Sequence, residues 1–143
     1  MKKRRRKRLL YVDSSVFIYP VVYDPLALPE AARAKEKLSE IASGVLKGCT
    51  ATLTWGELTW VVRRLFGPEK AASQGASFLT LPQLRLLKVD REVVLRAQTL
   101  LEEYGLKPRD AILAAAALEN GIGKILSFDE DFDAVPDLAR ITP

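Results

Sequence analysis

Short apolar runs alternate with helical stretches along almost the whole chain, and this alternation restricts the folds open to it. The apolar runs of strand length lie at 9–12, 49–53, 84–89 and 124–128, and a weaker one lies around Arg140 and Ile141. Helical periodicity predicts helices that begin at Ser14 and that span 29–46, 54–66, 69–79, 91–104 and 108–120. Strands that alternate with helices favour a parallel sheet covered on both faces. We therefore expect an α/β fold, a three-layer α/β/α sandwich around a mostly parallel sheet of four to five strands.

Proline and glycine predict where several helices begin and end. Pro29 suits the first turn of the helix over 29–46, and we expect Gly48 to end it. Val45 extends the apolar face of that helix. Gly121 is the expected C-terminal cap of the alanine-rich helix before it. No repeat or linker interrupts the pattern, so we expect one domain over 9–143.

The composition is typical of one globular domain. A chain of 143 residues, 48% of them hydrophobic, is long enough to bury a core. No apolar run approaches the roughly 20 residues that a membrane span needs. The single cysteine, Cys49, excludes an intramolecular disulfide and indicates a reducing compartment. We therefore expect a cytoplasmic protein without a membrane segment, and the lack of histidine and abundance of Arg and Glu favour a thermophilic source.

The first residues differ in charge from the rest of the chain. Residues 2–8 are all lysine or arginine, whereas the remainder contains slightly more acidic than basic residues. Because like charges repel, we expect residues 1–8 to form a disordered basic tail outside the fold. This tail is either a solvated extension or an arm that attracts polyanions. A secretory signal is not indicated, because the apolar run after the tail is too short.

Four acidic residues stand where the expected strands end or helices begin. Asp13 and Asp129 follow the first and fourth apolar runs, and Glu57 and Asp110 lie in the first turns of two helices. In an open parallel sheet these places fall at one edge, where such folds bind ligands. Because the chain has no histidine, an oxygen-only group of this kind favours Mg²⁺ or Mn²⁺ over Zn²⁺. The chemistry that suits it is metal-assisted attack of water on a phosphodiester.

Each of these residues also has an ordinary structural explanation. Glu57 has capping-box spacing to Thr54, and Asp110 suits the positive end of a helix dipole. Asp129 could cap the turn that follows it, and Asp13 could be a turn residue after a strand. Their joint placement beside the most apolar segments favours a site, because carboxylates brought together repel one another unless a cation neutralises them.

Four segments resemble the acidic motifs of PIN domains, in the same order and with similar spacing. Residues 10–18 resemble the opening strand motif, in which Asp is followed by Ser or Thr, and 52–58 resemble the second acidic motif. Residues 107–116 are similar to the D-A-x-x-A-A segment, and 127–132 are similar to the closing motif with two aspartates before Phe. The resemblance covers nearly the whole chain and implies a PIN-like sandwich.

The resemblance implies a metal-dependent endoribonuclease that uses Mg²⁺, for which Mn²⁺ substitutes. Asp13 and Asp110 would be the principal metal ligands. Glu57 would hold metal-bound water or bind the metal directly. Asp129 would bind a second ion or orient the attacking water.

Other residues in the motifs would support this centre. Ser14 and Ser127 match hydroxyl positions of the family and would hydrogen-bond the carboxylates or a phosphate oxygen. Asp131 would be an auxiliary carboxylate or a turn-stabilising residue, and Arg109 would contact an RNA phosphate. Ser15 departs from the family pattern, because Asn is common at this place.

The size of the chain is similar to that of the single-domain toxins of VapBC toxin–antitoxin pairs, which are PIN-domain ribonucleases. This likeness implies an RNA substrate, a cognate VapB-like antitoxin and a homodimer.

Three other functions stay open on the sequence alone. A standalone PIN-domain nuclease in RNA processing or decay would have the same motifs. A phosphotransfer domain of receiver or dehalogenase-like type also gathers Asp residues at strand ends, although the second acid of the dehalogenase-like pattern is replaced here by Ser15. A non-catalytic binding module would keep the carboxylates only as caps, and it would bind Mn²⁺ barely or not at all.

Overall fold

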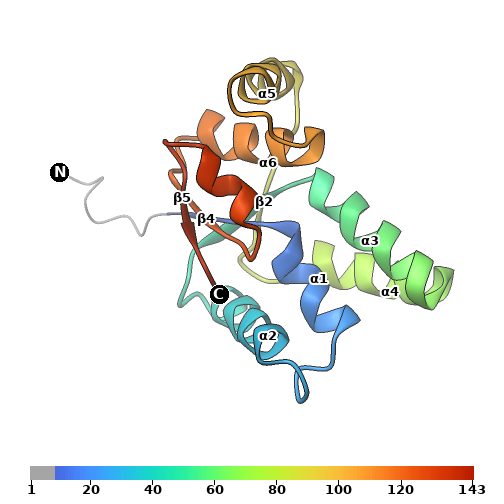
Figure 1. Ribbon diagram of the computed structural model, residues 1–143. Helices are drawn as coiled ribbons and strands as arrows, with labels where there is room; N and C mark the ends of the chain where they lie inside the picture. Colours follow the sequence, from blue (N-terminus) through green and yellow to red (C-terminus); the bar gives the residue numbers. More distant parts are fainter. Residues whose placement is uncertain (1–8) are drawn as a thin grey trace.

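The computed structural model describes residues 9–143, so the expected basic tail lies outside the described residues. A five-stranded sheet occupies the middle of the molecule (Figure 1). All of its pairings are parallel, and the strand order is β3-β2-β1-β4-β5. The strands are β1 (Leu10–Val12), β2 (Gly48–Ala51), β3 (Arg85–Leu87), β4 (Lys124–Leu126) and β5 (Ala139–Ile141).

Six α-helices and one 3-10 helix connect these strands. They are α1 (Ser14–Val22), α2 (Pro29–Ala42), α3 (Leu53–Phe66), α4 (Pro68–Leu79), α5 (Arg91–Tyr104), α6 (Pro108–Glu119) and η2 (Glu130–Ala134). None of the helices within residues 9–143 has the length and apolar character needed to cross a bilayer.

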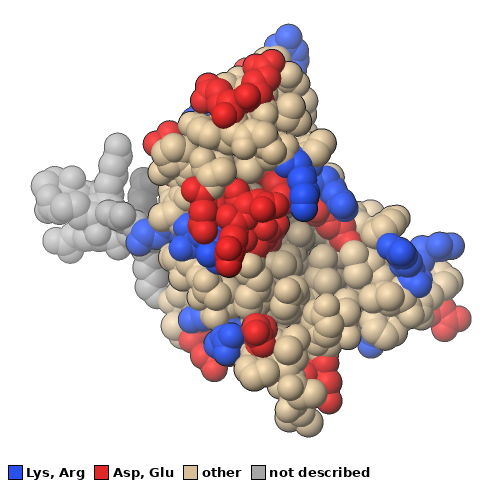
Figure 2. All heavy atoms as spheres, viewed as in Figure 1, with Lys and Arg blue, Asp and Glu red and all other residues tan. Residues whose placement is uncertain are grey.

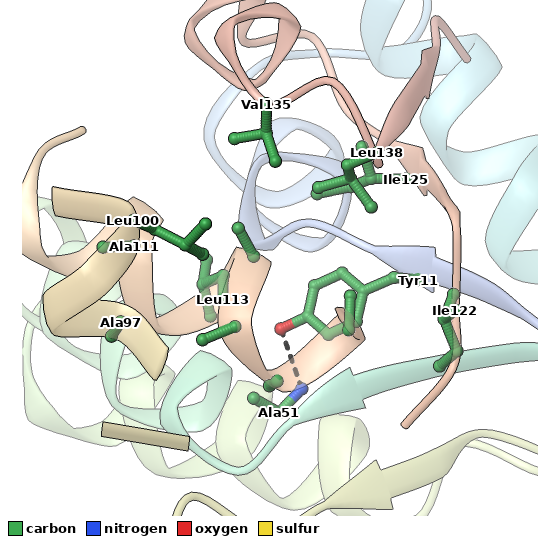
Figure 3. Close-up of a cluster of buried hydrophobic side chains, with 14 of the residues drawn as sticks. Tyr11, Ala51, Ala97, Leu100, Ala111, Leu113, Ile122, Ile125, Val135 and Leu138 are labelled. Atoms are coloured by element: carbon green, nitrogen blue, oxygen red, sulfur yellow. Dashed lines mark hydrogen bonds between the residues drawn. The ribbon is translucent and has the colours of Figure 1, made fainter. Parts of the chain in front are cut away.

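The two faces of the sheet bury separate apolar cores. Tyr11, Ala51 and Ile125 face one core, which the alanine-rich helix α6 fills together with α5 and η2 (Figure 3). The hydroxyl of Tyr11 accepts a hydrogen bond of 3.1 Å from the Ala51 N–H, so even the buried ring satisfies its polar atom. Val12 and Leu126 face the second core, under α1 to α4. The expected α/β/α sandwich with a parallel sheet is therefore confirmed.

Several predicted boundaries were wrong by a few residues. The helix expected over 29–46 ends at Ala42, because Gly44 adopts a left-handed backbone conformation with φ of 84°. Val45 lies beyond the helix and is 60% exposed. Gly48 does not end a helix; it begins β2, where a Cβ atom would come within 2.7 Å of the Ile41 side chain. The strand expected over 49–53 ends at Ala51, because α3 begins two residues later.

This topology places the carboxyl end of β1 at the centre of one sheet edge. The backbone N–H of Asp13 still donates to the Leu126 carbonyl, 3.0 Å away, so Asp13 is held against the end of β4. The N–H of Ser127 donates in the same way to the Ile141 carbonyl at the end of β5. The edge that parallel α/β folds use for binding is thus formed by Asp13, Ser127 and the starts of the following helices.

Candidate active site

Asp13 is a buried carboxylate held by three hydroxyl groups. The residue is only 4% exposed. Its Oδ2 accepts hydrogen bonds from Ser127 Oγ at 2.6 Å and Ser15 Oγ at 2.8 Å, and its Oδ1 lies 3.4 Å from Ser14 Oγ. Although Asp13 precedes α1, its side chain makes no capping hydrogen bond to that helix. The turn-residue explanation for Asp13 therefore does not account for its carboxylate.

Ser127 joins two of the predicted acidic residues. Its hydroxyl donates to Asp13 and accepts a hydrogen bond of 2.9 Å from the backbone N–H of Asp129. Ser127 is fully buried, so these bonds have no competition from solvent. Ser15, which departs from the family pattern, nevertheless supplies a hydroxyl to Asp13. Ser127, predicted to be a supporting residue, therefore holds Asp13 against the segment after β4.

Glu57 lies in α3 with one carboxylate oxygen that has no partner. The capping-box explanation is wrong, because the N-cap of α3 is Thr52 and no side chain caps it. Instead, Glu57 Oε1 is buried and makes no hydrogen bond within residues 9–143, while Oε2 lies 3.8 Å from Arg109 Nε. Burial, followed by the nearby charge of Asp13, raises the pKa of Glu57 from 4.5 to about 7. A buried acceptor without a donor is what a site for a cation or a water molecule requires.

Asp110 lies in the first turn of α6, where a proline at the first helical position and the helix dipole favour it. Burial raises its pKa from 3.8 to about 6, and the charges of Asp129, Asp13 and Asp131 add to the shift. The dipole explanation for Asp110 is consistent with its position, but the repulsion from three other aspartates shows that helix formation alone does not explain the residue.

Asp129 and Asp131 belong to the short helix η2 that follows β4. Asp129 caps η2, because its Oδ1 accepts a hydrogen bond of 2.9 Å from the Asp131 N–H. One carboxylate oxygen from each of Asp110, Asp129 and Asp131 lies within 4.8 Å of the others, a group that could hold a metal ion. Asp131, expected from the sequence to be an auxiliary or turn-stabilising residue, is the exposed member of this group. Asp13 and Glu57 lie outside this group. The charge of Asp13 nevertheless raises the pKa of Asp110, and the charge of Asp110 raises the pKa of Glu57.

The donor set fits a hard divalent cation. It consists of carboxylate oxygens from several elements, which is the ligand type that Mg²⁺ and Mn²⁺ prefer. Figure 2 shows acidic side chains gathered near the centre of one face, with basic side chains on either side. The nearest cations are exposed ones at the rim: Arg109 beside Glu57, and Lys107 with its Nζ 3.6 Å from Asp131 Oδ2. These side chains are 64% and 77% exposed, so solvent reaches both of them.

One residue that positions the site was missed by the sequence analysis. Arg140 in β5 donates to both carboxylate oxygens of Asp133, at 2.9 and 3.2 Å, and to the Ser127 carbonyl at 3.3 Å. It therefore holds both ends of the segment that carries Asp129 and Asp131. Arg140 and Asp133 lie in different elements, β5 and η2, so their contact depends on the pairing of β4 with β5 and not on a local sequence pattern.

Comparison with known proteins agrees with the geometry. A family model described as the PIN domain matches residues 10–138. No curated protein matches the chain. Among solved structures, the chain is similar to VapC20 of Mycobacterium tuberculosis, a toxin that cleaves the sarcin–ricin loop, with 20% identity and a TM-score of 0.71 over 94% of this chain and 99% of that one.

Two further solved structures are similar to this chain. VapBC2 of Rickettsia felis, bound to a DNA fragment from its promoter, has 16% identity and a TM-score of 0.69, covering 94% of this chain and 98% of that one. FitAcB of Neisseria gonorrhoeae has 20% identity and a TM-score of 0.68, covering 94% and 97%. At these identities the likeness shows a shared fold.

Proposed function

Because this chain belongs to the PIN domain family, we propose that it is a metal-dependent endoribonuclease that hydrolyses RNA phosphodiester bonds as the toxin of a toxin–antitoxin pair. The observation that carries the proposal is the convergence of carboxylates from β1, α3, α6 and η2 on one sheet edge, with a buried Glu57 oxygen left without a partner. Family membership gives no support to the phosphotransfer alternative, and the partnerless oxygen argues against a cluster kept only as caps.

Asp110, Asp129 and Asp131 would hold the ion, with Asp13 beside them at the end of β1. A bound Mg²⁺ or Mn²⁺ would supply Lewis-acid polarisation of the phosphodiester. The three serine hydroxyls around Asp13 would keep its carboxylate in one orientation, which limits the reorganisation needed when substrate arrives.

Glu57 is suited to move a proton. Its buried Oε1, which has no hydrogen-bond partner within residues 9–143, would accept a proton from the attacking water. Arg109 and Lys107 stand at the rim of the cluster, where their exposed cations would contact RNA phosphates and offset the repulsion from the aspartates.

The partners follow from the same proposal. Structures similar to this chain include a toxin–antitoxin complex from Klebsiella pneumoniae and a DNA-bound VapBC from Salmonella typhimurium. We expect this chain to bind a small VapB-like antitoxin and to form a homodimer. Light scattering of the purified chain, alone and with the product of a small neighbouring gene, tests both expectations.

The test of the activity compares matched Asp-to-Asn variants. Asp110→Asn and Asp13→Asn should lower cleavage of a single-stranded RNA in Mn²⁺ by about a thousandfold or more, since each removes charge from the centre. Asp137→Asn is the control, because Asp137 is exposed and precedes β5, at the opposite edge of the sheet. If both site variants cleaved RNA as fast as the wild type, with unchanged melting temperatures and no cleavage in metal-free controls, the assigned centre would be excluded.

A standalone nuclease in RNA processing remains the second candidate. Growth arrest on expression of the wild-type chain, relieved by Asp110→Asn and by co-expression of an antitoxin, distinguishes the toxin from it.

A further inference from the structure

A small pocket opens beside the acidic cluster, at the junction of α1, the start of α2 and the segment after β4. Its volume is about 420 Å³, and its lining consists of Tyr19, Tyr23, Leu28, Glu30 and Phe128. Three of these residues are aromatic, although aromatic residues make up only 8% of the chain. The pocket is therefore enriched in flat side chains well beyond the average composition.

The aromatic rings in this pocket pack against one another. Tyr19 and Phe128 are stacked, with centroids 4.4 Å apart and an angle of 16° between the ring planes. Tyr23 meets Tyr19 edge to face at 5.2 Å and is 47% exposed. Tyr19 lies in the last turn of α1 and Tyr23 is the C-cap of that helix, whereas Phe128 comes from the far end of the chain. Two distant segments thus present stacked aromatic surface at one place.

The stacked rings lie near the proposed catalytic centre. Phe128 stands between Ser127, which holds Asp13, and Asp129. Tyr19 follows Asp13 by six residues, about 9 Å along the axis of α1 at 1.5 Å per residue. The pKa of Tyr19 is raised, first by burial and also by the charges of Glu30, Asp129 and Asp13. A group in the pocket would therefore lie next to whatever the carboxylates bind.

The charged side chain of the pocket is Glu30, in the first turn of α2. No hydrogen bond or ion pair to its carboxylate exists within residues 9–143, and the positive end of the helix dipole stabilises its charge. An ionised carboxylate only accepts hydrogen bonds and repels anions. The pocket therefore disfavours a phosphate and suits a flat, uncharged group that carries N–H donors.

We propose that this pocket binds a nucleobase of the RNA, adjacent to the phosphodiester that the acidic centre cleaves; this inference rests on the proposed ribonuclease function. Bases stack on aromatic side chains, and carboxylates accept hydrogen bonds from the amino groups of bases. Tyr23 and Phe128 supply the stacking surface, and Glu30 selects bases with amino donors. Guanine fits best, because it offers two neighbouring N–H donors to one carboxylate, and uracil fits worst.

The test combines a protein change with a substrate change. A short RNA of mixed sequence is cut in Mn²⁺, the cut position is mapped, and each flanking nucleotide is made abasic in turn. For the wild type, one abasic position should lower kcat/KM about tenfold, the size expected for one lost base stack. Tyr23→Ala should lower kcat/KM about tenfold on the intact RNA but cause no further loss on that abasic RNA, because both changes remove the same contact.

Two further variants separate the ring from the carboxylate. Tyr23→Phe keeps the ring and should cleave the intact RNA as the wild type does. Glu30→Gln should keep the stacking but narrow the preference for guanine over uracil at the mapped position by about tenfold, measured as the ratio of kcat/KM for two RNAs that differ only there. Tyr104→Ala, on α5 and outside this pocket, is the control and should change neither quantity.

The outcomes distinguish failure of this inference from failure of the proposed function. If the wild type cleaves RNA but Tyr23→Ala shows the same loss of kcat/KM at each abasic position, the pocket does not bind a base. If Tyr23→Ala leaves cleavage unchanged and weakens only antitoxin binding, the pocket belongs to the protein partner and the inference is overturned. If neither the wild type nor any variant cleaves RNA, the proposed function fails first. A binding experiment tests the pocket without turnover. The Asp110→Asn variant should quench a fluorescent purine analogue placed in the RNA, and the double variant with Tyr23→Ala should not.

Discussion

The Ser127 hydroxyl serves two groups at once, and its loss has a predictable cost. It donates to Asp13 and accepts from the Asp129 N–H, and the residue is fully buried. Ser127→Ala leaves both groups without this partner, so we expect the free energy of unfolding to fall by about 1–3 kcal/mol. Urea denaturation measures the change. Ser43→Ala, which removes an exposed hydroxyl bonded to the Glu40 carbonyl, is the control and should cost less than about 0.5 kcal/mol.

Single residues also show how far sequence reasoning reaches. Asp13, Glu57, Asp110 and Asp129 could be singled out because strand and helix ends can be recognised in the sequence. The partnerless Glu57 oxygen could not, since it depends on how α3 lies against α6. The capping-box spacing even predicted the wrong partner for Glu57, because α3 begins earlier than its most regular pattern indicates.

At the scale of elements, Arg140 couples β5 to η2, and this coupling should affect metal binding. Arg140→Ala removes the side-chain hydrogen bonds to the Ser127 carbonyl and to Asp133, between which Asp129 and Asp131 lie. We expect Mn²⁺ affinity, measured by isothermal titration calorimetry, to fall about tenfold, as is typical when the residues that orient metal ligands are lost. Arg140→Lys should recover only part of the affinity, because lysine lacks the two-pronged geometry of the guanidinium.

The control for this experiment is Arg96→Ala. Arg96 makes a comparable ion pair of 2.7 Å with Glu119, but this pair links α5 to α6 away from the carboxylates. Both alanine variants should lose a small amount of stability, and only Arg140→Ala should lose metal affinity. Equal Mn²⁺ affinity in the two variants would show that the contacts of Arg140 with Ser127 and Asp133 do not position the aspartates.

Element boundaries were harder to predict than element types. Gly48 was expected to end a helix, yet its role is to let β2 approach Ile41. A glycine is compatible with either use, and only the packing of α2 on the sheet decides between them. The parallel pairing was predictable because buried strands alternate with helices, whereas the strand order depends on contacts between residues far apart in the chain.

For the whole molecule, the crowded carboxylates should make the metal-free fold sensitive to pH. In the folded state the pKa of Glu57 rises from 4.5 to about 7 and that of Asp110 from 3.8 to about 6. The folded state therefore binds more protons than the unfolded state in this window, and stability falls as pH rises from about 4 to about 7.

We expect the melting temperature in chelator to be higher near pH 5 than near pH 8. These two values lie below and above the folded-state pKa of Glu57. Added Mn²⁺ should raise the melting temperature most at the higher pH, because ions bind the ionised carboxylates. A melting temperature that rises from pH 5 to pH 8 in chelator would contradict this expectation.

The hydrogen bond between Ser127 and Asp13 joins residues 114 positions apart, and it has a consequence for how the protein comes into being. A nascent chain that has released β1, α3 and α6 still lacks Ser127, Asp129 and Asp131, which follow β4. Since ribosomes add roughly 5–20 residues per second, the carboxylate cluster stays incomplete until synthesis has passed η2. A chain cut short before β4 therefore lacks Ser127 and two of the three aspartates that could hold a metal ion.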